Sequence, residues 1–180
     1  MTSRISAVDP AVAEGKTKSL LGTVKAKMGV VPNMMKTMAI SPALLEGYLT
    51  FSGALAKGVL PPAVREQLAL TVSQHNGCEY CLAAHSLFAG RSGLKPNEIA
   101  WAREGVASDA KTQAALSLAQ NILDHRGDVS NEQLADARDA GLSDAEIAEV
   151  VGHVALSTLT NYFNQLAHTE VDFPRAAVNV

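Results

Sequence analysis

The sequence predicts an all-α protein, and three observations support this fold class. Ala, Leu, Glu, Lys and Gln, which favour helix, fill most of the chain between short breaks. Pro, Ser and Gly residues stand at these breaks, where helices commonly begin and end. Alternating runs of β-branched residues, the usual mark of strands, are missing, since the pair Val30-Val31 is too short. We therefore expect helices and no sheet.

Boundary signals divide the chain in order. Pro42, Pro62 and Pro96 stand near the first turns of the third, fourth and sixth expected helices, where a missing N–H does no harm. The turn pair Asn76-Gly77 separates the fourth helix from the fifth. Residues 105–109 separate the sixth from the seventh, and this break is too short to be a domain linker.

The last two helices begin at capping boxes. Ser130 precedes Gln133 by three residues, and Ser143 precedes Glu146 by three, so each pair can satisfy two backbone N–H groups at a helix start. No linker divides the chain, and we expect residues 1–180 to form one domain. The expected helices are 10–28, 33–39, 42–57, 62–75, 78–91, 96–104, 109–125, 131–139 and 144–168.

Composition and charge exclude several classes of protein. The chain has 180 residues, 47% of them hydrophobic, and a formal net charge of −3. A disordered chain is excluded, and the dispersed basic residues make a nucleic-acid or anionic-membrane partner unexpected. The first residues lack a secretory signal pattern, and no run approaches the about 20 apolar residues that span a bilayer. We therefore expect a cytoplasmic protein with reduced thiols.

The two cysteines form a C-x-x-C with a histidine in register. Cys78 follows Asn76-Gly77 and is expected in the first turn of a helix, whose N-terminus stabilises a thiolate. Cys81 and His85 follow at spacings of three and four residues, which share one helix face. His85 can therefore exchange a proton with a thiol, and the second thiol can resolve an oxidised first one.

A carboxylate on the preceding helix completes the candidate site. Glu66 lies among Val and Leu residues, and partial burial there would raise its pKa towards the range of a general base. Because the turn at Asn76-Gly77 folds the two helices into a hairpin, Glu66 can approach the helix that carries Cys78, Cys81 and His85 from the side.

Two other interpretations of these residues stay open. Free cysteines are often buried as apolar residues, although the register with His85 argues against that interpretation. Two thiolates, a histidine and a glutamate could also supply four zinc ligands, but no second ligand pair stands out near the remaining histidines His125, His153 and His168. We therefore expect redox chemistry, with no metal and no bound cofactor.

The pattern Glu66-x11-Cys78-x2-Cys81-x3-His85 resembles the alkyl hydroperoxidase D and carboxymuconolactone decarboxylase superfamily, specifically its peroxidase-related branch. The resemblance spans roughly residues 28–174. It also includes three flanking stretches, which are Met28-Gly-Val-Val-Pro-Asn33, Ser41-Pro42 and Asn161-Tyr-Phe-Asn164 with Asp172-Phe-Pro174. It implies an alkyl hydroperoxidase D-like helical fold with the C-x-x-C at a helix N-terminus. The decarboxylase members, by resemblance, do not use this cysteine pair, so its presence favours a thiol peroxidase.

The resemblance also implies a role for each site residue. Cys81 would attack an organic hydroperoxide and become a sulfenic acid, and Cys78 would protonate the leaving oxygen and then form a disulfide with Cys81. Glu66 and His85 would move protons. A dithiol protein, lipoyl-bearing or thioredoxin-like, would reduce the disulfide. Alkyl hydroperoxidase D has a histidine immediately before the second cysteine, where this chain has Tyr80.

Other positions leave alternatives. His75 is a possible partial substitute for that missing histidine. Asn161 and Asn164 share a face of the last helix and are either buried anchors or pocket lining. The apolar helices favour a homo-oligomer, and the family is typically trimeric or built from trimers. A carboxymuconolactone decarboxylase-like protein, or a non-enzymatic oligomer with a vestigial thiol pair, is the alternative function. Residues 172–180 are expected to pack across the body or onto another subunit.

Overall fold

A computed structural model describes residues 3–174 of the chain. Within this range the protein is all-α and contains no strand. The predicted fold class is thus confirmed, and the C-x-x-C lies at the start of a helix. The helices are α1 (Gly15–Met28), α2 (Asn33–Met38), α3 (Pro42–Leu55), α4 (Pro62–His75), α5 (Glu79–Arg91), α6 (Pro96–Arg103), α7 (Ala110–Asp124), α8 (Asn131–Asp139) and α9 (Asp144–Ala167).

The described helices match the expected ones except at the first. Helix α1 begins at Gly15 rather than near residue 10, because a turn occupies the preceding residues. There the Asp9 carboxylate accepts a hydrogen bond from the Ala11 N–H at 2.9 Å, and the Asp9 carbonyl accepts one from the Val12 N–H at 3.2 Å. An aspartate bonding its own following backbone favours a turn over a helix. Both expected capping boxes, at Ser130 and Ser143, are present.

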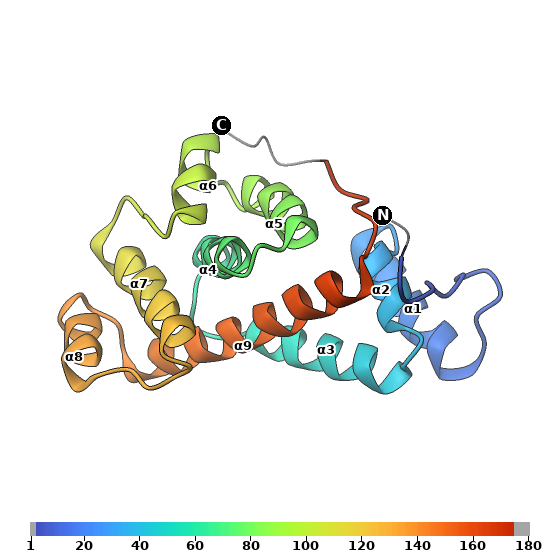
Figure 1. The fold of residues 1–180 in the computed structure, drawn as a ribbon, viewed down its shortest axis with the longest axis horizontal. Coiled ribbons are helices and arrows are strands. Elements are labelled where there is room, and N and C mark those ends of the chain that lie inside the picture. Colours follow the sequence, from blue (N-terminus) through green and yellow to red (C-terminus); the bar gives the residue numbers. More distant parts are fainter. Residues whose placement is uncertain (1–2, 175–180) are drawn as a thin grey trace.

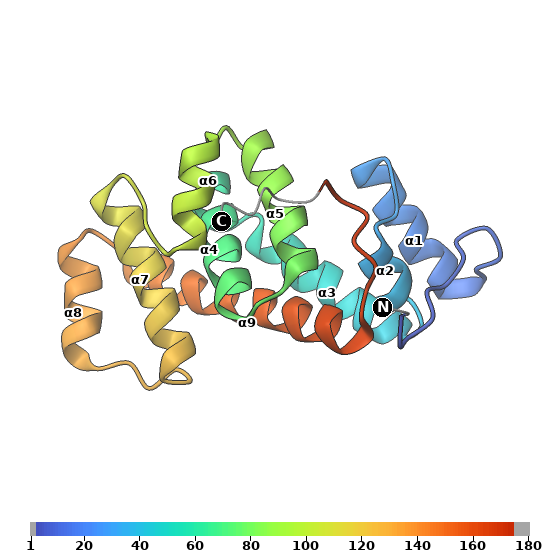
Figure 2. The ribbon, with the colours of Figure 1, turned by 45° about the horizontal axis from the view of Figure 1, so that its top comes forward.

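Helix α4 is the centre of the arrangement. It packs against α5, α6, α7 and α9, and Figure 1 shows it end-on, surrounded by them. The long helix α9 runs beside α3 along the base of the view, from α7 and α8 at its N-terminal end to α1 and α2 at its C-terminal end. In the tilted view of Figure 2, α4 and α5 lie over α9, with α5 nearer to its C-terminal end. The α4–α5 hairpin is therefore held between neighbours on several sides.

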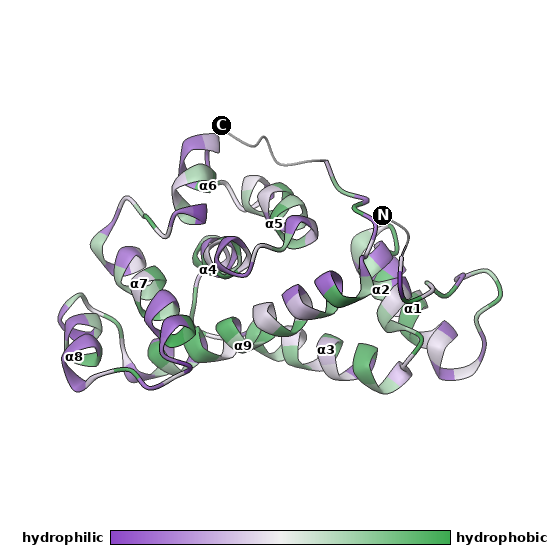
Figure 3. Cartoon of the chain, viewed as in Figure 1, coloured by the Kyte–Doolittle hydropathy of each residue, from purple (hydrophilic) through white to green (hydrophobic). Residues whose placement is uncertain are grey.

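Hydrophobic residues divide into packed clusters that fix this hairpin. One cluster joins α1, α2 and α3 to the start of α5 and includes both cysteines and Tyr80. A second joins α4 to α7, α8 and α9 through Leu68, Leu116 and Val150, which are fully buried. Figure 3 shows that α8 is mostly hydrophilic, whereas α3 and α9 carry hydrophobic residues along their length. No helix among the described residues is both long and apolar enough to cross a bilayer.

The link between α3 and α4 is tied to α9 by one carboxylate. Glu149 accepts hydrogen bonds from the backbone N–H groups of Val59 and Leu60 at 2.7 and 3.0 Å. Gly58 lies directly against the same carboxylate, so that a Cβ atom at position 58 would collide with it. The missing side chain of Gly58 is therefore what allows Glu149 to reach the turn.

We expect Gly58→Ala to lower the free energy of unfolding by about 1–3 kcal/mol, because the displaced carboxylate would lose bonds to two N–H groups. Gly47→Ala is the matched control: Gly47 is exposed within α3, and a Cβ there meets nothing within 4 Å. That variant should be neutral or more stable by about 0.5–1 kcal/mol. Urea denaturation measures both, and a Gly58→Ala protein as stable as the wild type would contradict the tie.

Candidate functional site

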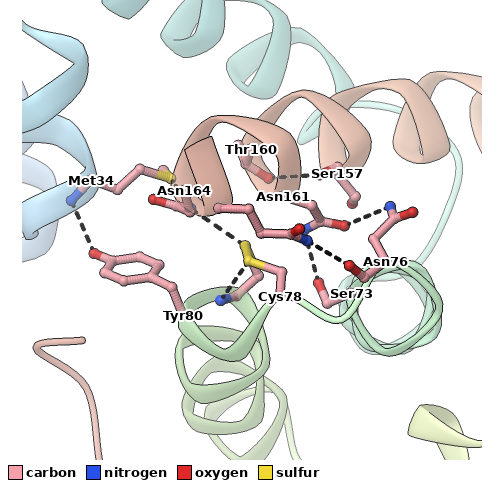
Figure 4. Close-up of a disulfide and its surroundings, with 11 residues drawn as sticks. Met34, Ser73, Asn76, Cys78, Tyr80, Ser157, Thr160, Asn161 and Asn164 are labelled. Atoms are coloured by element: carbon pink, nitrogen blue, oxygen red, sulfur yellow. Dashed lines mark hydrogen bonds between the residues drawn. A yellow bond between two sulfur atoms is a disulfide. The ribbon is translucent and has the colours of Figure 1, made fainter. Parts of the chain in front are cut away.

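The site begins at the turn between α4 and α5. Gly77 adopts the left-handed conformation, with φ of 68°, which the sharp reversal requires. Cys78 is the residue that caps α5, and its Sγ accepts a hydrogen bond from the Cys81 N–H at 3.3 Å. Cys78 and Cys81 form a disulfide, with Cα atoms 5.4 Å apart (Figure 4). Both sulfur atoms therefore lie in the positive field of the helix N-terminus.

Glu66 of α4 approaches α5, as expected from the hairpin, and meets His85 there. The Glu66 Oε2 atom lies 2.8 Å from His85 Nδ1, and both side chains are partly buried. A carboxylate held against an imidazole fixes the orientation of the ring and lets the pair exchange a proton. His85 lies one turn after Cys81 on the same helix.

These groups open onto one apolar cavity. It has a volume of about 370 Å³ and contains Cys81, Glu66 and His85 in its wall. The rest of the wall is chiefly thioether, aliphatic and aromatic, including Met28, Met34, Met35, Leu49, Phe88 and Phe173. Cys78 is not among the lining residues. The two cysteines of the pair are therefore presented differently, which their spacing did not predict.

The two asparagines of α9 serve different purposes. Asn161 is fully buried, donates to Ser73 Oγ at 3.2 Å and accepts from Asn76 Nδ2 at 2.9 Å, so it anchors the α4–α5 turn. Asn164 donates from Nδ2 to Cys81 Sγ at 3.4 Å and to Met34 Sδ (Figure 4). Asn161 is thus the anchor among the two expected alternatives, whereas Asn164 contacts the disulfide itself.

Asn164 also carries an unpartnered atom. Its Oδ1 is buried and has no hydrogen-bond partner among the described residues. A buried polar atom without a partner is unfavourable unless something else binds there. In the sequence, this residue is marked by its position three residues after Asn161 and by the stretch Asn161-Tyr-Phe-Asn164 of the family resemblance.

Tyr80 connects residues 169–174, which we call the closing segment, to the site. Its hydroxyl accepts a hydrogen bond from the Met34 N–H at 3.1 Å and donates one to Asp172 Oδ1 at 2.9 Å. The other Asp172 oxygen accepts from the Asn33 N–H at 2.8 Å. The Phe173 ring then packs edge-on against the rings of Tyr80 and Phe88, at 5.5 and 5.7 Å between centroids.

The packing of this segment bears out one of the two expectations for the end of the chain. The described part of the stretch 172–180 packs across the body, and residues 175–180 lie outside the described residues.

His75 does not replace the missing histidine, because it lies outside the cavity wall. Its Nδ1 lies 3.8 Å from Asp124 Oδ1 of α7.

The phenol of Tyr80 stays protonated, because burial raises its pKa.

A smaller, more polar cavity shares Glu66 and His85 with the apolar cavity. Its volume is about 170 Å³, and Arg65 and His153 are among its lining residues. His153 is buried, and its Nε2 has no partner among the described residues. Burial, and secondarily the charge of Arg65, lower the pKa of His153. In the sequence His153 stands out only as one of the remaining histidines weighed for zinc.

No set of zinc ligands is assembled among the described residues. Across residues 3–174, no three or more His, Cys, Asp or Glu side chains are grouped so that they could hold a metal ion. Glu66 and His85 instead bond each other, and the two cysteine sulfur atoms bond each other.

Comparison with known proteins places this geometry in a family context. Residues 42–123, a little under half of the chain, match the carboxymuconolactone decarboxylase family. This segment spans α3 to nearly the end of α7 and contains Glu66, both cysteines and His85. No curated protein matches the chain.

Solved structures share the fold over nearly the whole chain. An alkylhydroperoxidase AhpD core, peroxidase-related protein of Ralstonia eutropha JMP134 is 21% identical, with a TM-score of 0.84 and coverage of 94% of this chain and 92% of its own. A peroxidase-related protein of Silicibacter sp. TM1040 is 20% identical, with a TM-score of 0.81 and 98% coverage of both chains. The debrominase Bmp8, as a cysteine-to-alanine variant in complex with 2,3,4-tribromopyrrole, is 18% identical, with a TM-score of 0.80 and coverage of 96% and 93%.

The family match over residues 42–123 and the shared fold of the solved structures agree with the resemblance to the alkyl hydroperoxidase D and carboxymuconolactone decarboxylase superfamily. The chain has the all-α fold of the AhpD core together with a C-x-x-C pair. At these identities the solved structures establish the fold of the chain and not its reaction, which has to be inferred from the chemistry of the site.

We expect Tyr80→Phe to release the closing segment, because the phenyl ring keeps the packing but loses the bonds to Met34 and Asp172. Hydrogen exchange at residues 171–173 should become faster, and the free energy of unfolding should fall by about 1–3 kcal/mol. The pKa of Tyr80 is higher in the folded state than in the unfolded state. Its contribution to the free energy of unfolding is therefore fully present below the unfolded pKa of about 10 and is lost as pH rises above it.

Part of that alkaline loss should disappear in Tyr80→Phe, as measured by urea denaturation between pH 8 and about pH 11. Tyr162→Phe is the control, since Tyr162 is 60% exposed on α9. Equal alkaline destabilisation in the wild type and in Tyr80→Phe would contradict the buried phenol.

Proposed function

We propose that the protein is a thiol-dependent peroxidase that reduces organic hydroperoxides through Cys81 and Cys78. The observation that carries this proposal is that Cys81 and the Glu66–His85 pair line one apolar cavity. A sulfur nucleophile, an acid–base pair and an apolar wall are the parts needed to bind and cleave an apolar peroxide.

The first step uses Cys81 as the nucleophile. Its thiolate, stabilised by the start of α5 and by the Asn164 amide, attacks one peroxide oxygen, and the O–O bond breaks. Cys81 becomes a sulfenic acid, and the leaving alkoxide takes a proton to become an alcohol. We assign this proton to the Glu66–His85 pair rather than to Cys78, because the pair lines the cavity and Cys78 does not.

The second step closes the disulfide. The Cys78 thiol attacks the Cys81 sulfenic sulfur, and the hydroxyl leaves as water with the thiol proton. A Cα separation of 5.4 Å is within the usual range for a disulfide. A dithiol donor, lipoyl-bearing or thioredoxin-like, then returns both thiols at the cost of its own oxidation. Such a cycle suits the cytoplasm, where thiols are kept reduced.

The shape and chemistry of the cavity support an organic substrate over hydrogen peroxide. Its volume of about 370 Å³ exceeds what hydrogen peroxide needs, and Met, Leu and Phe side chains dominate its wall. Apolar substituents on the peroxide would gain free energy from leaving water there.

We also propose a homo-oligomer. Leu159, Tyr162 and Leu166 lie at helical spacing on α9 and are 39, 60 and 62% exposed. Large apolar side chains on one helix face favour burial against another subunit.

One equivalent of cumene hydroperoxide should remove both free thiols from the reduced protein, and dithiothreitol should restore them. Cys81→Ser should abolish peroxide consumption. Cys78→Ser should consume one equivalent of hydroperoxide and then stop with an over-oxidisable Cys81, which mass spectrometry would detect.

Glu66→Gln should slow the first step at least about tenfold, since general acid–base groups contribute about 10²–10⁴-fold.

His125→Gln is the matched control for Glu66→Gln. His125 is exposed and lies outside the cavity wall, so this variant should leave the rate of the first step unchanged. Persistence of both wild-type thiols in excess hydroperoxide would refute the peroxidase proposal.

Reductive debromination of an aromatic ring is the second candidate. The debrominase Bmp8 shares the fold, and the aromatic and thioether wall around Cys81 suits a halogenated ring. The balance requires two thiols: the carbon–bromine bond becomes carbon–hydrogen, bromide and a proton are released, and Cys78 and Cys81 become the disulfide. We expect reduced protein with 2,3,4-tribromopyrrole to release stoichiometric bromide, measured by ion chromatography, if this candidate is correct. The absence of bromide alongside peroxide consumption would select the peroxidase.

A further inference from the structure

We propose that the electron donor reaches the disulfide through a separate groove and attacks Cys78, while the substrate reaches Cys81 through the apolar cavity. This inference rests on the proposed thiol cycle and adds the place where the donor enters it. We call this entrance the Cys78 groove; it has a volume of about 700 Å³ and is lined by residues 77–80, Asn164, Gln165 and residues 168–171.

The two openings present different sulfur atoms. Cys81 lines the apolar cavity and is absent from the wall of the Cys78 groove, whereas Cys78 lines the groove and is absent from the wall of the cavity. Tyr80 borders both, and its bond to Asp172 holds the closing segment between them. Residues 169–171 of this segment line the groove, and Phe173 lines the cavity. The segment therefore separates the two routes.

The chemistry of the groove differs from that of the cavity. Within the described residues its wall carries the carboxylates of Glu79 and Glu170 and the imidazole of His168, and it contains no Lys or Arg. Gln165 and Thr169 add further polar groups. An apolar hydroperoxide gains little from such a wall, whereas a thiol carrier with positive charge near its thiol is attracted to it.

The position of Cys78 limits what can attack it. The residue is only 1% exposed and is part of the groove wall. A flat protein surface cannot reach a sulfur atom in that position, so the attacking thiol must project from its carrier. The partner is therefore a dithiol on a projecting group, with neutral or basic surroundings.

The exchange step then balances with Cys81 as the leaving group. The donor thiolate bonds to Cys78 Sγ, the Cys78–Cys81 bond breaks, and its electron pair stays on Cys81. The Asn164 N–H already directed at Cys81 Sγ stabilises that thiolate. The second donor thiol next attacks the first donor sulfur, which closes the donor disulfide and releases Cys78. The two donor protons end on Cys78 and Cys81.

Asn164 lies next to both the groove and the departing sulfur. It lines the groove and is 3% exposed, and its Nδ2 donates a hydrogen bond to Cys81 Sγ at 3.4 Å. It therefore lies beside the route of entry and beside the sulfur that departs.

Small thiols of different charge test the route. The full-length protein is oxidised with diamide, and the rates of its reduction by cysteamine and by 2-mercaptoethanesulfonate are compared at low ionic strength. The cationic-to-anionic rate ratio should fall about threefold in the double variant Glu79→Gln, Glu170→Gln, because two carboxylates no longer attract the cation. Lys27→Gln, an exposed position in the wall of the substrate cavity, should leave the ratio unchanged.

The attacked sulfur can be identified directly. Reduction with limiting 2-mercaptoethanol, quenched by N-ethylmaleimide, should leave mercaptoethanol on Cys78 and maleimide on Cys81 in tandem mass spectra. The reverse assignment, or a rate ratio that responds to Lys27→Gln and not to the groove variants, would overturn the proposal. Because diamide makes the disulfide without peroxide, failure of peroxide turnover leaves these readouts intact, and their failure leaves peroxide turnover intact.

Discussion

The buried start of α5 is the constraint on which the rest of the structure depends. A helix N-terminus inside a protein leaves backbone N–H groups that need partners. The sulfur of Cys78 satisfies the N–H of Cys81, and Asn161 braces the turn before it through Ser73 and Asn76. The same arrangement that satisfies the backbone therefore places two sulfur atoms in a positive field beside α9. The same turn thus serves both the stability of the helix start and the placement of the disulfide.

The disulfide divides its surroundings into unlike halves. Towards Cys81 the wall is apolar, with one acid–base pair, and towards Cys78 it is polar and acidic. Tyr80 and the closing segment form the boundary, held by the bonds of Asp172 to the Tyr80 hydroxyl and to the Asn33 N–H. Under the proposed thiol cycle, the oxidant and the reductant would each meet a different environment.

Much of what depends on neighbouring residues follows from the sequence. Helix limits follow from capping boxes, prolines and the Asn76-Gly77 turn, and the pairing of Glu66 with His85 follows from the hairpin that this turn creates. The early start expected for α1 failed because Asp9 bonds its own backbone, a local competition that composition does not reveal.

Contacts between distant segments were beyond the sequence. Asn164 meets Cys81 across 83 residues, and Tyr80 meets Asp172 across 92. Helical periodicity specifies which face a residue occupies and says nothing of which helix will cover that face. The different presentation of Cys78 and Cys81 depends on those same contacts, so it emerges only when α9 and the closing segment are in place.

Tyr80 shows what a single replacement changes in this framework. A histidine before the second cysteine would supply an ionisable group close to both thiols. The phenol at this position is held protonated by burial and is engaged with both Met34 and Asp172, so it serves as an anchor. In the proposed mechanism, proton transfer at Cys81 therefore falls to Glu66 and His85, which line the same cavity as Cys81. Under the proposed thiol cycle, an anchor at this position leaves the acid–base chemistry to the substrate side and the sulfur exchange to the Cys78 side.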